Sequence, residues 1–130
     1  MENLDLILQA FACLGDLQTA MRQLREKCIS NGLPTTLWFD LTRSQNGVLI
    51  QGFVDVELPN GNAISSHVDI SGNSDNFTVE ATRRLTTNLG QDFIDGLDSV
   101  DCRTETELMT AIQKCITWVQ KSEIPHGRVP

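Results

Sequence analysis

The sequence predicts an α+β fold, a two-layer sandwich with a long N-terminal helix, a four-stranded antiparallel β-meander and a C-terminal helix. Apolar residues recur every three or four positions over residues 4–30, which is typical of an amphipathic helix. They alternate with polar residues over residues 35–87, which is typical of strands, and return to helical spacing after residue 104. The length of 130 residues suits one domain, expected over residues 1–121, with a flexible C-terminal tail over residues 122–130.

The first helix has clear signals at both ends. Asn3 is a good N-cap, and Gly32 followed by Pro34 is a typical helix stop. Gly15 is the weak point, because a glycine inside a helix costs about 1 kcal/mol relative to alanine. The helix would be roughly 40 Å long, so one small sheet would leave part of its apolar stripe uncovered. That part would have to meet another element or another chain.

The meander is expected to contain four strands, over residues 35–43, 48–58, 63–71 and 77–87. Asn46-Gly47 is the strongest short hairpin signal in the chain and predicts a two-residue type I′ turn. A turn at this position would pair Phe39 with Val54 and place their side chains on one apolar face.

A second turn predicts the next pairing independently. Pro59-Asn60-Gly61 fits a three-residue loop with glycine in the left-handed position, and it would pair Val56 with Ile64. Because a slip of one residue would turn every side chain to the other face, the agreement of the two turns supports the predicted faces.

The chain beyond the third strand gives signals of unequal clarity. The fourth strand would place Phe77 opposite Ile70 on the same apolar face. Residues 88–103 favour a short helix or an irregular packed segment over a strand, because glycines interrupt their apolar residues. Thr104 and Glu107 form a capping box that begins the last helix.

The predicted registers also define the sheet face that points away from the helices, called the outer face below. Trp38 would lie opposite Asp55, and His67 would lie between Phe53 and Glu80. Open sheet faces are usually polar, so two large aromatic residues there indicate an interaction surface. The candidate binding residues are Trp38, Asp40, Phe53, Asp55, His67, Asp69 and Glu80.

Three interpretations of the outer face stay open. Trp38 and Phe53 could cover each other, or lie under residues 88–103. The face could bind a partner, including a second copy of the chain. It could also line a ligand or catalytic pocket.

The polar residues of the outer face allow two kinds of chemistry. His67 beside Glu80 could act as a base, although Ser65 is its one obvious nucleophile and lies on the same strand. Carboxylates spread over three strands more often form a solvated acidic face than a cation site, which usually comes from a loop. We therefore expect no metal and no cofactor at Asp40, Asp55 and Asp69.

Charge narrows the class of partner, while the start of the chain and the cysteine spacing predict its location and the state of its thiols. The 17 acidic against 10 basic residues give a net charge of −7, which argues against nucleic acid and anionic membranes and permits a basic protein partner. The start of the chain lacks the positive charge and apolar run of a signal peptide, so we expect a cytoplasmic protein. The four cysteines form no C-x-x-C pair, so reduced, buried thiols are expected.

No motif in the sequence names a reaction. We expect a non-enzymatic protein-binding module, such as an adaptor, an inhibitor or a chaperone-like protein, that uses the outer face or the long first helix. The alternative is a small-ligand-binding protein or small enzyme with a cleft between helix and sheet, in which His67 and Asp69 supply the polar groups. A homodimer formed through the first helix is a third possibility.

Overall fold

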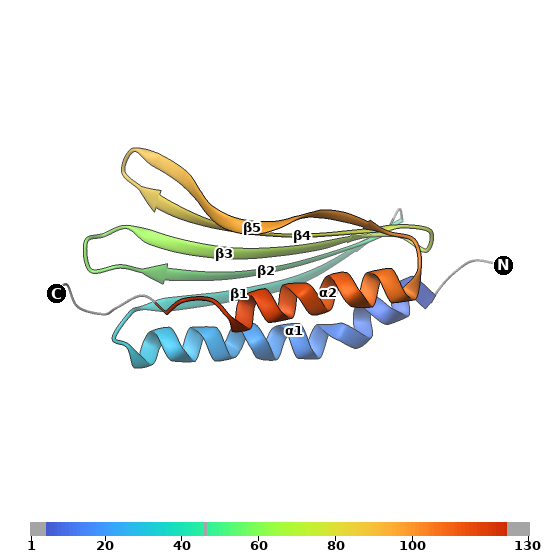
Figure 1. The fold of residues 1–130 in the computed structure, drawn as a ribbon, viewed down its shortest axis with the longest axis horizontal. Helices are drawn as coiled ribbons and strands as arrows, with labels where there is room; N and C mark the ends of the chain where they lie inside the picture. Colours follow the sequence, from blue (N-terminus) through green and yellow to red (C-terminus); the bar gives the residue numbers. More distant parts are fainter. Residues whose placement is uncertain (1–4, 46, 125–130) are drawn as a thin grey trace.

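The computed structural model describes residues 5–45 and 47–124. One antiparallel sheet has its strands in the order β1-β2-β3-β4-β5, and both helices run along the same side of it (Figure 1). The predicted α+β sandwich is therefore confirmed, with five strands in place of four. The elements are α1 (Asp5–Ser30), β1 (Thr35–Ser44), β2 (Gly47–Glu57), β3 (Ala63–Gly72), β4 (Phe77–Thr87), β5 (Gly90–Cys102) and α2 (Glu105–Gln120).

The extra strand is β5, so the prediction of a short helix or irregular segment over residues 88–103 was wrong. Register shifts between Val79 and Ala81, and again between Arg83 and Arg84, interrupt the pairing of β4 with β5. Such bulges break the two-residue period that marks a strand in a sequence. Gly96 lies inside the strand and does not end it. A glycine is needed there, because a Cβ would lie 2.5 Å from the Ala81 carbonyl oxygen of β4.

The β1–β2 hairpin differs from the predicted register by two residues. Ser44 pairs with Gly47, so Gly47 belongs to β2 and not to the turn, and Phe39 pairs with Gly52. A Cβ at Gly47 would lie 2.1 Å from the Gly72 carbonyl oxygen. The glycine is therefore required by a close approach of two backbones, and the Asn-Gly signal misplaced the turn.

Of the other two predicted registers, one is confirmed and one was wrong. The β2–β3 register is confirmed, with Val56 opposite Ile64 and Gly61 at a φ of +87° in the loop. The β3–β4 register was wrong by two residues, because Phe77 lies opposite Gly72. The missing side chain at Gly72 leaves room for the phenyl ring, since a Cβ would lie 2.7 Å from its Cγ. Both errors are shifts of two, so every side chain keeps its predicted face.

The sheet face under the helices, called the inner face below, carries the core. Its alternate residues pack with the apolar stripes of α1 and α2 into one cluster. Burying this apolar surface is the main stabilising contribution to such a fold. The capping box is confirmed, since Thr104 Oγ1 accepts from the Glu107 backbone N–H and Glu107 accepts from that of Thr104. The largest fully buried side chains include Phe77, Leu17, Met21, Ile50, Ile70 and Ile112.

The long first helix finds most of its cover within this chain. It packs against β1, β2 and α2, while Leu8 and Ile29 stay 62% and 51% exposed. Neither helix is both long and apolar enough to cross a membrane, within the part of the chain described. Residues 125–130 of the expected tail lie outside the described residues.

Candidate functional site

The structure places all seven candidate residues on the outer face; it confirms the predicted pairing of Phe53 with His67 and changes the partners that β1 and β4 supply. Trp38 pairs with Phe53, and Phe53 pairs with His67, so the three rings form one row across β1, β2 and β3. The predicted pairing of Trp38 with Asp55 was wrong, for the same two-residue shift. Asp69 lies opposite Glu80.

The three rings touch, and we call Trp38, Phe53 and His67 the ring row. The Trp38 and Phe53 ring centroids are 5.1 Å apart at an interplanar angle of 34°. The Phe53 and His67 rings stack with centroids 3.9 Å apart at 18°. Trp38 ends the row on the edge strand β1 and is 49% exposed. Stacking thus holds the indole in place while leaving about half of its surface available for contact.

The segment over residues 88–103 does not cover the ring row. It forms β5 and its turn, which lie beyond β4, at the opposite edge of the sheet from β1. Both helices lie on the inner face (Figure 1). Among the described residues, the ring row is therefore covered by its own members and by no other element.

His67 contacts a different carboxylate from the one predicted. Its Nε2 lies 3.0 Å from Asp69 Oδ1 on the same strand, an ion pair when the imidazole is protonated. These two atoms are buried and hydrogen-bond to no described residue, so each is the other's polar neighbour. The His67–Glu80 pair was wrong, because Thr82 is the cross-strand neighbour of His67 on β4.

The other described polar groups of the outer face hydrogen-bond to one another and do not gather around His67. The Ser65 hydroxyl donates a hydrogen bond to Asp55, which holds it away from His67. Asp40 accepts from Thr42 Oγ1 at 3.1 Å. In the described part of the chain, no three His, Cys, Asp or Glu side chains gather as a metal site would require. His67 and Asp69 also point away from the helices, so they cannot line a cleft between helix and sheet.

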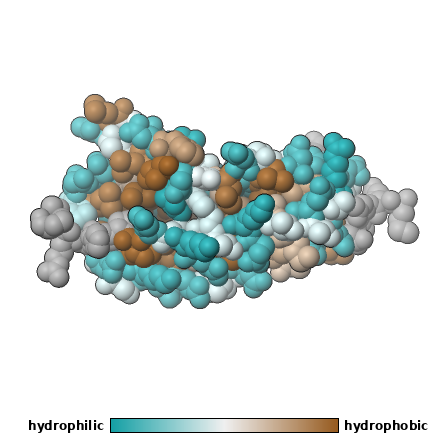
Figure 2. All heavy atoms as spheres, in the orientation of Figure 1, coloured by the Kyte–Doolittle hydropathy of each residue, from teal (hydrophilic) through white to brown (hydrophobic). Residues whose placement is uncertain are grey.

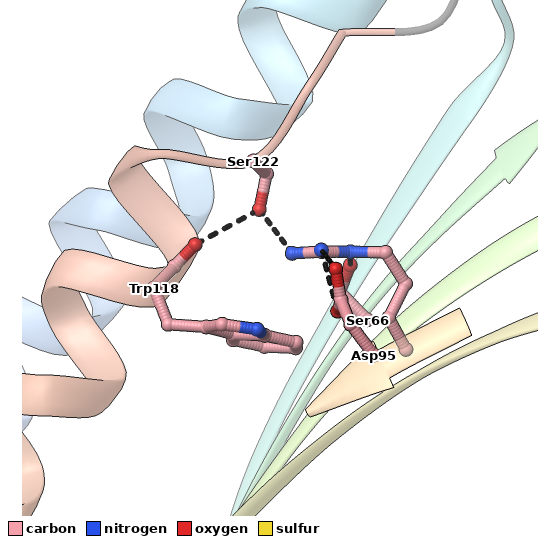
Figure 3. A network of polar contacts seen from close by, with 5 residues as sticks. Ser66, Asp95, Trp118 and Ser122 are labelled. Atoms are coloured by element: carbon pink, nitrogen blue, oxygen red, sulfur yellow. Dashed lines mark hydrogen bonds and ion pairs between the residues drawn. The ribbon is translucent and has the colours of Figure 1, made fainter. Parts of the chain in front are cut away.

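A second cluster lies on the inner face and was not predicted. Arg83 on β4 donates to both carboxylate oxygens of Asp95 on β5, at 2.7 and 2.8 Å. Its Nε donates to Ser66 Oγ on β3 at 3.1 Å, and a terminal nitrogen donates to Ser122 beyond α2. The guanidinium carbon lies 4.2 Å from the centre of the Trp118 ring (Figure 3). Two carboxylate oxygens, two hydroxyls and one ring thus surround this guanidinium.

One sequence signal could have found this cluster. The inner-face positions of β4 carry Phe77, Val79 and Ala81, and the next alternate residue is Arg83. A charged residue on a buried face is uncommon unless it is paired. The break in alternation marks the place where the core gives way to a polar network.

A groove borders this network between α2 and the β4–β5 side of the sheet. It has a volume of about 730 Å³, and Arg83 and Asp95 form part of its wall. The same two residues also line a smaller cavity of about 450 Å³ toward the end of α1. The Arg83–Asp95 pair therefore lines both spaces.

The four cysteines are free thiols, of which Cys28, Cys102 and Cys115 are buried and Cys13 is half-buried. Burial raises the pKa of Cys115 from its ordinary value of 9.0 to about 12. Burial also raises the pKa values of Cys28 and Cys102. A nucleophilic cysteine needs a lowered pKa and access to solvent, and these three buried residues have neither.

Comparison with known proteins gives no relative from which a role could be carried over. No family model, no curated protein and no solved structure matches this chain. The ring row, the Arg83 network and the groove beside it are the features of the described chain that point to a role.

Proposed function

We propose that this chain is a non-enzymatic protein-binding module whose outer face takes a basic segment of a partner protein. The observation that carries the proposal is the ring row, with Trp38 49% exposed on a sheet face that no described element covers. Tryptophan is among the residues most often found at the energetic centre of protein interfaces. An indole held by stacking loses little freedom when a partner packs on it.

The charges around the ring row favour a basic partner. Asp40, Asp69 and Glu80 lie in the cross-strand row on one side of it, and the row on the other side holds Asp55 on β2 and Arg84 on β4. The carboxylates beside the row thus outnumber the one cation. A guanidinium or ammonium group can lie on the indole face while neighbouring carboxylates accept its hydrogen bonds. The net charge of −7 would also speed encounter with a positively charged surface.

Among the residues that the structure describes, the polar groups of the outer face pair with one another, which supports binding over catalysis. The Ser65 hydroxyl is held by Asp55, and the polar neighbour of the His67 Nε2 atom is Asp69. A general base acts within hydrogen-bond reach of the group it deprotonates. On this arrangement His67 supports the rings by stacking.

Peptide binding tests the proposal directly. A labelled peptide of alternating arginine and valine should bind the protein, and the same peptide with glutamate for arginine should not. Trp38→Ala should weaken binding by about tenfold or more, the loss typical of a central interface residue. Leu89→Ala is the matched control, because it removes an apolar side chain that is 94% exposed at the β4–β5 turn.

Two results would count against the outer face. Equal affinity of the wild type and Trp38→Ala for the arginine peptide would show that the peptide binds elsewhere. Light scattering that shows a dimer in the wild type and a monomer in Trp38→Ala would make a second copy the occupant of this face. Binding that weakens as salt rises is the expected companion result, because exposed charges are screened by salt.

A further inference from the structure

The groove between α2 and β5 has an apolar body. Leu97 of β5 and the Trp118 ring line it, and Met109 of α2 does so while remaining 49% exposed. Figure 2 shows apolar side chains gathered over β4 and β5, beside the polar surface of α2. A volume of about 730 Å³ lies within the range of pockets that hold small organic molecules.

The charges that line the groove are unbalanced. Asp95 is the one acidic side chain among the lining residues, and both its oxygens accept from Arg83. Lys114 and Lys121 also line the groove and form no ion pair with the residues that the structure describes. Two uncompensated ammonium groups thus face one groove in a chain whose net charge is −7. The local charge favours an anion, although the whole protein is acidic.

The two lysines lie on either side of the aromatic ring along the helix. Lys114 lies four residues before Trp118, and Lys121, the C-cap of α2, lies three residues after it, so each is about one helical turn from the ring. The ring is held from beneath by the Arg83 guanidinium, 4.2 Å away. Because four hydrogen bonds to the side chains of Ser66, Asp95 and Ser122 fix that guanidinium, the ring on it is already ordered before any ligand binds.

We propose that this groove binds a small amphipathic anion, an apolar chain or ring system that ends in a carboxylate or a similar acidic group. The apolar part lies on Leu97, Met109 and the Trp118 ring, and the acidic end lies at Lys114 and Lys121. This site is separate from the outer face, so its test does not depend on the proposed protein-binding function.

The two tryptophans of the chain allow a clean titration. In a Trp38→Phe variant, Trp118 is the single tryptophan and its emission reports on the groove. Decanoate, kept below its micelle concentration, should change this emission and reach saturation. Decyltrimethylammonium has a chain of the same length with the opposite charge, and it should give no saturable change.

Lysine substitutions complete the test. In the same background, Lys114→Gln with Lys121→Gln should weaken decanoate binding by about tenfold or more. Lys27→Gln is the matched control, because Lys27 lies in the last turn of α1 and does not line the groove. Circular dichroism of each variant separates lost binding from lost folding.

Three results would overturn the proposal. The first is the absence of a saturable decanoate response in the single-tryptophan protein. The second is equal binding of decanoate and decyltrimethylammonium, or of the double lysine variant and Lys27→Gln. The third is a change in Trp118 emission with protein concentration alone, which would make a second copy of the chain the occupant of the groove.

Discussion

The two tryptophans show how differently the faces of this sheet hold an aromatic side chain. On the outer face, Trp38 leans on Phe53 and the ring row continues to His67, with no hydrogen bond among the three. On the inner face, Trp118 covers Arg83, which Asp95 and two hydroxyls fix in place. The outer face thus carries a stacked, half-exposed surface, while a hydrogen-bonded, partly buried network lies between the inner face and the C-terminal part of α2. The difference predicts that a substitution on the outer face costs less stability than one in the core of the inner face.

The largest expected effect is the difference in stability loss between a substitution on the inner face and one on the outer face. Phe77→Ala removes a fully buried ring from the inner face and should lower the free energy of unfolding by about 3–5 kcal/mol. Trp38→Ala removes a half-exposed ring and should cost about 1 kcal/mol, the value of an aromatic pair. Urea unfolding of both variants measures the difference. Similar losses for the two would mean that the outer face is part of the core.

A pair of neighbouring arginines gives the next largest contrast. Arg83→Met leaves the buried Ser66 hydroxyl without its partner and should cost about 2 kcal/mol, because an unpaired buried polar group is expensive. Arg84 points to the outer face and is exposed, so Arg84→Met should change stability by less than about 0.5 kcal/mol. Equal effects in urea unfolding would show that the network around Arg83 does not stabilise the fold.

The buried thiol of Cys115 on α2 makes the free energy of unfolding depend on pH at high pH. An unfolded thiol ionises near its ordinary pKa of 9.0, while the folded one stays protonated up to about pH 12. Its contribution to stability is therefore complete below pH 9 and falls between pH 9 and 12, by about 1.4 kcal/mol per pH unit. Cys115→Ala should lose this slope. Parallel curves for the two proteins in urea unfolding from pH 8 to 10.5 would contradict a buried, neutral thiol.

The smallest effect concerns the solvent side of α1, away from both faces. Gly15 lies within the helix, and a Cβ there would meet nothing within 4 Å. Gly15→Ala should therefore raise the free energy of unfolding by about 0.5–1 kcal/mol, because alanine restricts the unfolded chain and favours a helix. A thermal melt against the wild type measures the gain. A lower melting temperature would reveal a packing contact that Gly15 needs.

The faces of the sheet could be predicted from sequence, but two of its registers could not. Alternation assigns Phe39, Val54 and Ile70 to the inner face in any register that shifts by two. Turn chemistry alone cannot distinguish Gly47 as a turn residue from Gly47 as a strand residue crowded by the Gly72 backbone. The strand β5 was missed for a different reason, because bulges in its pairing with β4 remove the two-residue period that marks a strand in a sequence.

Of the two candidate sites, the outer face could be predicted from sequence and the Arg83 network could not. The outer face follows from alternation within each strand, so its seven candidate residues could be assigned from local sequence. The Arg83 network joins Ser66, Asp95 and Ser122, which lie 17, 12 and 39 residues from it in the chain. Local patterns carry no information about side chains that meet only when β3, β5 and the end of α2 are in place.

One NMR titration tests the central claim on both faces at once. The chain has two tryptophans, so a ¹⁵N spectrum contains two indole N–H signals, from Trp38 on the outer face and Trp118 in the groove. Adding the arginine–valine peptide should shift the Trp38 signal progressively and leave the Trp118 signal in place. A shift of Trp118 alone, or no shift of either signal at saturating peptide, would contradict the outer face as the site for a basic partner.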